Sequence, residues 1–200
     1  TRYETLFPYT TLFRSLVIYS TEHAFTPEAA RRSTRPLVLI INCIHPGECA
    51  GKDACLQMLR DDMCAPGRDP FLRDTNVLIL PIFNVDGHER RSPYNRMNQL
   101  GPAEQGWRVT AAGYNLNRDF LKADAVEMQA WLGVWTAWQP DLLIDTHTTD
   151  GMDHQYDLAY AGGSNPFLDA DAGAWLDALM DAVVPQVEHD GYGMFPYAWP

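Results

Sequence analysis

The first residues that could do chemistry lie where an apolar run ends in a turn. Residues 37–44 are mostly aliphatic and lead into His45-Pro46-Gly47-Glu48. The Pro-Gly turn lets the imidazole and the carboxylate converge, provided that Glu48 lies in the first turn of the helix that follows. Imidazole nitrogen and carboxylate oxygen are both zinc ligands. The pair alone leaves two interpretations open, a metal site and a structural histidine held by hydrogen bonds.

A second histidine occupies an equivalent position. Residues 142–144 form a short apolar run, and His147 follows it after Asp145 and Thr146. The carboxyl ends of parallel strands meet at one edge of an α/β sheet, where such sheets bind their ligands. The sequence therefore predicts two imidazoles and one carboxylate, from His45, Glu48 and His147, at this edge. Three protein ligands leave the fourth position of a tetrahedral zinc ion open, as in catalytic sites.

Hydrophobic periodicity predicts the elements that would position these residues. Apolar runs predict strands over residues 16–20, 37–44, 77–83, 142–147 and near 155–160. Helical spacing predicts helices over residues 50–66, 128–138 and 176–187, with a further helix capped by Thr26, and it places the tryptophans of 128–138 in the core. We expect a single α/β domain over residues 16–200, with a mixed, mostly parallel sheet flanked by helices on both faces.

Composition narrows the class of protein. The chain has 200 residues, of which 46% are hydrophobic, which suffices for a real core. Its formal net charge of -11 argues against a nucleic-acid partner. It contains no run of eighteen apolar residues, which argues against a membrane span, and its four cysteines form no C-x-x-C pair. We expect those cysteines to be buried thiols.

The two ends of the chain show no regular pattern. Residues 1–15 have no clean period and resemble a translated cloning adaptor, so we expect a non-native leader there. The chain stops at residues 197–200 without closing an element. We therefore expect the C-terminal part of the domain to be missing.

Four motifs occur in an order that points to a family. They are His45-Pro46-Gly47-Glu48, Asn84-Val85-Asp86-Gly87, Asn117-Arg118-Asp119-Phe120 and Ile144-Asp145-Thr146-His147, and they cover about residues 36–160. This order resembles the zinc metallocarboxypeptidases of the carboxypeptidase A type, whose established ligand set is two histidines and a glutamate. The resemblance implies one zinc ion held by His45, Glu48 and His147. It also implies hydrolysis of the C-terminal bond of peptides with a free carboxylate, and it favours an exported, periplasmic or extracellular protein.

The same resemblance implies roles for residues that contact the substrate. Asn117 and Arg118 match the pair that holds the C-terminal carboxylate, because a planar guanidinium can bind a carboxylate bidentately while the adjacent amide adds a hydrogen bond. Arg108 is the predicted arginine that stabilises the oxyanion, with Arg96 as the alternative.

Three positions depart from the family pattern, and one of them, Val85 in place of a proline in the second motif, changes little. Gly47 stands where many relatives carry an arginine that contacts substrate further from the scissile bond. Asn115 stands where many have an aspartate that orients the first zinc histidine. Asparagine can accept the same hydrogen bond without bringing a charge.

Other functions remain open, and the general base is missing. The Asn117-Arg118 pair also suits an N-acyl amino acid amidohydrolase of the desuccinylase/aspartoacylase type, or a non-catalytic zinc protein that binds peptide C-termini. The family places a glutamate base well after the third ligand, but here only Glu188 follows His147, in a predicted solvated helix terminus, and Glu127 lies on the polar side of its helix. We expect this chain to bind zinc but to hydrolyse peptides negligibly.

Overall fold

The computed structural model describes residues 16–64, 72–149, 151–162 and 168–197. The predicted leader, residues 1–15, lies outside this range, and so does the end of the chain from residue 198. The chain divides into two compact units, residues 1–151 and 152–200. The predicted metal ligands all belong to the first unit.

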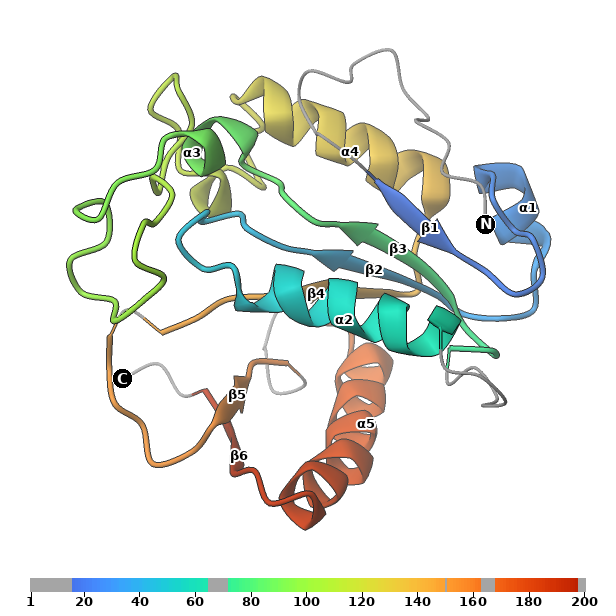
Figure 1. Cartoon of the computed structure of the whole chain (residues 1–200). Helices are drawn as coiled ribbons and strands as arrows, with labels where there is room; N and C mark the ends of the chain where they lie inside the picture. The colour runs from blue at the N-terminus through green and yellow to red at the C-terminus, as the bar shows by residue number, and fades with distance from the viewer. Residues whose placement is uncertain (1–15, 65–71, 150, 163–167, 198–200) are drawn as a thin grey trace. The chain divides into compact units, whose positions relative to one another are not determined.

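The first unit is built on a mixed, mostly parallel sheet (Figure 1). Its strands lie in the order β1 (Val17–Tyr19), β3 (Asn76–Leu80), β2 (Leu37–Ile41) and β4 (Leu142–Asp145). Strand β1 is antiparallel to β3, whereas β3, β2 and β4 run parallel. Ile41 pairs with Leu80 on one side and with Asp145 on the other, so these three strands end at the same edge.

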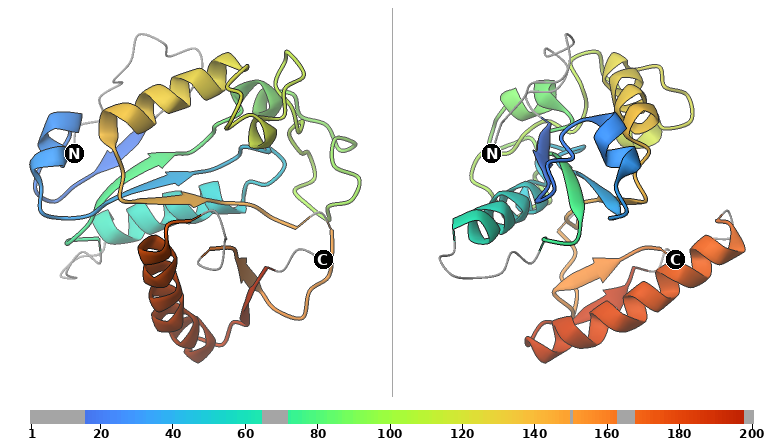
Figure 2. Two further views of the ribbon diagram at one scale, coloured as in Figure 1. Left: turned by 180° about the vertical axis from the view of Figure 1, so that it is seen from behind. Right: turned by 90° about the vertical axis from the view of Figure 1, so that its right-hand side faces the viewer.

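Helices cover both faces of this sheet, as predicted (Figure 2). Leu37, Leu39 and Ile41 belong to a core cluster with α1 (Pro27–Arg32) and α4 (Val126–Trp138). Ile40 and its neighbours on β3 pack instead with α2 (Ala50–Cys64). The change of face at successive residues follows from the two-residue repeat of a β-strand. Trp131 and Trp138 are buried in the α4 cluster, which confirms their predicted place in the core.

Two local predictions need correction. Helix α2 begins at Ala50, so Glu48 lies in the turn before the helix and not in its first turn. The cysteines are free, but only Cys43 and Cys55 are buried, and Cys64 is exposed at the end of α2. The predicted cap of α1 is confirmed, because the Thr26 hydroxyl accepts a hydrogen bond from the backbone N–H of Ala29.

The second unit contains a parallel pair of short strands and one long helix. The strands are β5 (Leu158–Tyr160) and β6 (Met194–Pro196), and the helix α5 (Ala170–His189) begins after the capping residue Asp169. In the part of the chain that the structure describes, no helix has both the length and the apolar character needed to cross a membrane.

Candidate metal centre

Two strand ends and one tight turn bring the predicted ligands together. His45 lies four residues beyond the end of β2, and His147 lies two residues beyond the end of β4. The backbone N–H of Glu48 donates to the carbonyl of His45 at 2.8 Å, which folds the Pro-Gly turn back on itself. One ligand atom from each of His45, Glu48 and His147 then lies within 4.8 Å of the others. We call these three residues the metal triad.

Both imidazoles of the metal triad point the same nitrogen at Glu48. Nδ1 of His45 lies 3.0 Å from Oε1, and Nδ1 of His147 lies 2.7 Å from Oε2. The outer nitrogens have partners of their own: Nε2 of His45 lies 3.1 Å from Oδ1 of Asn115, and Nε2 of His147 lies 3.0 Å from Oδ2 of Asp145. A histidine that binds a metal through one nitrogen typically donates its other N–H to a carbonyl or carboxylate. The arrangement therefore has the outer contacts of a metal centre.

The donor set fits zinc. Two imidazole nitrogens and a carboxylate oxygen are the ligand types of catalytic zinc sites. Nδ1 of His45 is buried and makes no hydrogen bond of acceptable geometry, although it faces Glu48, and buried polar atoms normally have a partner. His45 and Glu48 are 2% and 3% exposed, whereas 35% of the His147 side chain is accessible. A metal held here would be enclosed on one side and reachable from the other.

Glu48 and His147 of the metal triad shift each other's pKa. Burial by itself would raise the pKa of Glu48, but His147, His45 and Arg96, which face its two oxygens, hold that pKa well below its usual range. Burial by itself would lower the pKa of His147, but Asp145 and Glu48 raise it to about 9. Since a ligating imidazole must be neutral, a metal would displace a proton from His147.

A glycine that the sequence analysis overlooked positions the end of β4. The Thr146 hydroxyl donates to Oδ1 of Asn42 at 2.7 Å, and this contact ties β4 to the end of β2. A Cβ at Gly51, in the first turn of α2, would lie 2.2 Å from the Thr146 hydroxyl oxygen. Only glycine lets the helix approach so closely, and the one sequence signal was a glycine near the start of a predicted helix.

The predicted carboxylate clamp, Asn117 and Arg118, is linked to the metal triad through Asn115. Oδ1 of Asn115 accepts from the backbone N–H of Asn117 at 3.1 Å and caps the short 3-10 helix η1 (Leu116–Arg118). The same oxygen faces His45. Nδ2 of Asn117 lies 3.4 Å from Nε2 of His147, so Asn117 adjoins the triad. Arg118 is exposed, and its Nη1 donates to the carbonyl of Asn117 at 2.8 Å.

The two arginines that the sequence offered as alternatives both reach the same oxygen. Nη2 of Arg96 donates to Oε1 of Glu48 at 2.9 Å, and Nη1 of Arg108 lies 3.6 Å from that atom. Arg96 is 5% exposed, and its stem lies against Gly47, where a Cβ would come 2.8 Å from its Cγ. The Arg108 side chain is 35% accessible. Arg96 is therefore a buried partner of Glu48, and Arg108 is the more accessible of the two arginines.

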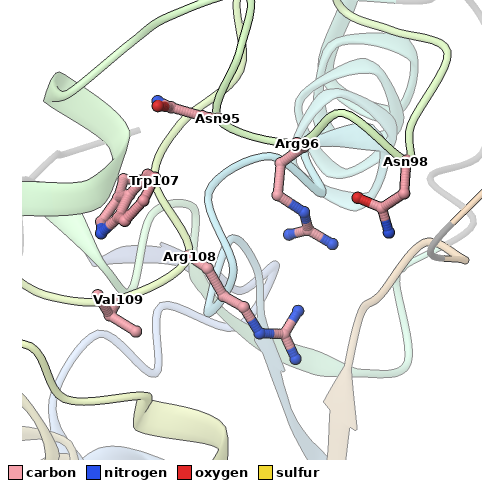
Figure 3. Close-up of a pocket in the computed structure, with 6 residues that line it drawn as sticks. All are labelled: Asn95, Arg96, Asn98, Trp107, Arg108 and Val109. Carbon is pink, nitrogen blue, oxygen red and sulfur yellow. The ribbon is translucent and has the colours of Figure 1, made fainter.

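Both arginines line a pocket (Figure 3), and their contacts with Glu48 connect it to the metal triad. Its volume is about 430 Å³. We call it the arginine pocket, and its lining residues are Asn95, Arg96, Asn98, Trp107, Arg108 and Val109.

The fold and these contacts define a candidate zinc centre of the catalytic type, at the carboxyl edge of an α/β sheet. Residues 15–137 match the sequence profile of the zinc carboxypeptidases, and the chain belongs to that family. The match ends before His147, so the third member of the triad rests on the geometry. No protein of curated function matches the chain.

Solved structures share the fold. The chain is similar to the metallo-carboxypeptidase of Burkholderia cenocepacia, with 23% identity and a TM-score of 0.66 over 92% of this chain and 45% of the other. The metallo-carboxypeptidase of Pseudomonas aeruginosa gives 19% identity and a TM-score of 0.64 over 93% and 43%. Carboxypeptidase A of Helicoverpa armigera gives 15% identity and a TM-score of 0.61, over 90% of this chain and 48% of the other. The chain thus spans less than half the length of these proteins.

Proposed function

We propose that this chain carries the metal-binding and carboxylate-binding part of a zinc-dependent carboxypeptidase, which hydrolyses the C-terminal bond of peptides. One observation carries the proposal. His45, Glu48 and His147 converge within 4.8 Å, and Asn117 of the clamp lies 3.4 Å from His147. The residue proposed to bind the terminal carboxylate therefore lies beside the residues proposed to bind zinc.

Each residue of the metal triad has a distinct task in this proposal. Nδ1 of His45, Nδ1 of His147 and the Glu48 carboxylate would hold one zinc ion, while Asn115 and Asp145 fix the orientation of the two rings. Zinc bound there would polarise the scissile carbonyl and lower the pKa of a bound water. Arg96 restrains the Glu48 carboxylate from the side opposite its contact with His147.

The remaining residues bind and orient the substrate. The Arg118 guanidinium would exchange its bond to the Asn117 carbonyl for a bidentate bond to the terminal carboxylate, with the Asn117 amide as a further donor. Arg108 would face the scissile carbonyl oxygen, where a fixed positive charge stabilises the negative charge that develops in the transition state.

Zinc content after dialysis tests the metal triad. We expect one zinc per chain in the wild type and in His189→Ala, a control at an exposed position in the last turn of α5. We expect almost none in His147→Ala, since a three-ligand site that loses one ligand retains little affinity. Stoichiometric zinc in His147→Ala would remove the basis of the proposal.

Assays on the zinc-loaded chain separate the three functions that the sequence left open. Release of a C-terminal residue, release of an acyl group, and saturable binding without turnover each identify one of them. In the described part of the chain, the carboxylates that contact the triad are Glu48 itself and Asp145, which is bonded to His147. Neither is available as a general base. We therefore expect this chain to bind C-terminal carboxylates but to hydrolyse peptides negligibly, and efficient zinc-dependent release would contradict that expectation.

A further inference from the structure

We propose that Asn84 is a positioning residue for Arg108. The buried Asn84 side chain fixes the backbone of Arg108, so that the guanidinium lies where the negative charge of the transition state develops. This inference deepens the proposed function and rests on it, because it takes Arg108 to face the scissile carbonyl oxygen.

Asn84 is held at the same sheet edge as the metal triad. It lies four residues beyond the end of β3 and is 0% exposed. Its backbone N–H donates to the carbonyl of Cys43 at 3.2 Å, and the N–H of Phe83 donates to the carbonyl of Asn42 at 2.9 Å, so the two chain segments stay bonded beyond the paired strands. Since Cys43 is two residues before His45, the position of Asn84 is fixed relative to the first metal ligand.

The Asn84 amide uses both of its polar atoms. Oδ1 accepts from the backbone N–H of Gly87 at 2.9 Å and so caps α3 (Val85–Glu89). Nδ2 donates to the carbonyl of Arg108 at 3.3 Å, although the two residues are 24 positions apart in the chain. The cap requires only an acceptor, whereas the bond to Arg108 requires a donor. The two contacts can therefore be separated by substitution.

Two glycines let the loop approach closely enough for this bond. The N–H of Trp107 donates to the carbonyl of Gly87 at 2.7 Å. A Cβ at Gly87 would lie 2.3 Å from the Trp107 carbonyl oxygen, and a Cβ at Gly106 would lie 2.4 Å from Cβ of Pro46. Only glycine permits such approaches. The segment 106–108 is therefore packed against both α3 and the Pro-Gly turn.

The Arg108 guanidinium depends on this fixed backbone. Its Nη1 lies 3.6 Å from Oε1 of Glu48, at the end of a long side chain that starts from a loop (Figure 3). A donor that stabilises a developing negative charge is most effective when it is in place before the charge develops. The bond from Asn84 supplies a fixed starting point for that side chain, and it ties the loop arginine to the sheet edge.

Two variants of Asn84 separate its contacts. In Asn84→Asp the carboxylate can still accept from Gly87 but cannot donate to the Arg108 carbonyl. Asn84→Ser is a second variant without a charge, since a serine hydroxyl caps a helix but is shorter than the amide. Gln129→Glu is the matched control, because its exposed amide in α4 likewise donates to a backbone carbonyl, that of Ala123, at 3.0 Å.

Calorimetry on the zinc-loaded chain compares two ligands. One is N-acetyl-Ala-Phe, and the other is its analogue in which a phosphinate and a methylene replace the scissile carbonyl and the amide nitrogen. The phosphinate imitates the tetrahedral, negatively charged transition state. We expect the wild type and Gln129→Glu to bind the phosphinate at least about 100-fold more tightly than the peptide, as transition-state analogues do.

The two Asn84 variants should lose affinity for the phosphinate alone. We expect a loss of about tenfold in each, because a misplaced donor stabilises the negative charge less well. Zinc content and affinity for the peptide should not change, since the metal triad and the clamp keep their own contacts.

A double-mutant cycle tests whether Asn84 acts through Arg108. Arg108→Ala alone should weaken phosphinate binding about 100-fold. We expect Asn84→Asp combined with Arg108→Ala to bind the phosphinate as Arg108→Ala does, because the position of a missing guanidinium has no effect. A purely structural role of Asn84 would instead add its own loss to that of Arg108→Ala.

Three outcomes would overturn the inference and leave the proposed function intact. Wild-type affinity for the phosphinate in both Asn84 variants would reduce Asn84 to a helix cap. Additive losses in the cycle would show that Asn84 does not act through Arg108. Loss of zinc from both Asn84 variants, with zinc retained in Gln129→Glu, would assign Asn84 to the support of the metal triad. Equal affinities of the wild type for the two ligands would instead mean that the proposed function fails, and the role of Asn84 falls with it.

Discussion

The metal triad and the arginine pocket adjoin each other, but the chain builds them differently. His45 and His147 follow parallel strands whose register is fixed by backbone hydrogen bonds, with Ile41 paired to Asp145. The arginines of the pocket lie in a loop that is held by individual hydrogen bonds and not by a ladder of paired strands, for example by the bond from the Trp107 N–H to the Gly87 carbonyl at 2.7 Å. Metal ligands must be held at closely fixed positions, and the sheet fixes the two histidines. An arginine has a long side chain, so it can reach its target from a loop.

Glu48 belongs to the metal triad and contacts both arginines of the pocket, so its removal should have the largest effect. In Glu48→Ala we expect zinc binding to be lost and the free energy of unfolding to fall by about 3 kcal/mol, because buried Arg96 loses a carboxylate partner. Denaturant unfolding in chelator and zinc analysis measure the two effects separately. The control is Glu104→Ala, at an exposed position of the loop that carries Arg96 and Arg108. It should change neither zinc binding nor the free energy of unfolding. An unfolding curve for Glu48→Ala that matches the wild type would refute the role assigned to Arg96.

A substitution at Gly51 in α2 should weaken zinc binding by the metal triad, although Gly51 is not a member of the triad. In Gly51→Ala the new methyl would overlap Thr146, and we expect a loss of about 1–3 kcal/mol in stability together with weaker zinc binding. Gly133→Ala is the matched control, because a Cβ at that position of α4 meets nothing within 4 Å. It should be neutral or gain about 0.5–1 kcal/mol from helix propensity. Similar melting temperatures for the two variants would mean that α2 can move away from Thr146 at little cost.

The carboxylate clamp can be weakened without disturbing the metal triad. In Arg118→Lys we expect binding of a small carboxylate ligand to the zinc-loaded chain to fall about tenfold, because a point ammonium cannot reproduce a bidentate fork. Zinc content should not change, since Arg118 is exposed and bonded to the carbonyl of Asn117. Calorimetry measures the ligand affinity, and zinc analysis measures the zinc content. Equal ligand affinities in the wild type and in Arg118→Lys would mean that Arg118 supports the structure of η1 and does not bind the carboxylate.

The same contrast explains what the sequence could predict. Apolar runs and helical spacing are local signals, and they identified the four strands of the first unit, the helices on both faces of its sheet and the convergence of His45, Glu48 and His147, but not β6. The loop of residues 88–115 has no such period, so the sequence offered Arg96 and Arg108 as alternatives although both contact Glu48. The closeness of Gly51 to Thr146 is a contact between residues 95 positions apart, and no local pattern reports it.

The smallest predicted effect concerns the residue that joins the metal triad to the clamp. Oδ1 of Asn115 both faces Nε2 of His45 and caps η1, so Asn115→Asp should keep the cap while adding a charge behind the ligand. A carboxylate in that position makes the imidazole a more basic ligand. We expect the zinc affinity, measured by competition with a chelator, to rise by a factor of about three to ten, with stability in chelator unchanged.

Asn115→Ala completes the comparison, because it removes both contacts of this oxygen at once. It should weaken zinc binding about tenfold and also weaken binding of a carboxylate ligand, since the backbone N–H of Asn117 loses its acceptor. If Asn115→Asp and Asn115→Ala changed zinc affinity in the same direction, the contact with His45 would not tune the metal. A loss of zinc affinity with full carboxylate binding in Asn115→Ala would show that the sheet-borne triad and the loop-borne clamp are positioned independently.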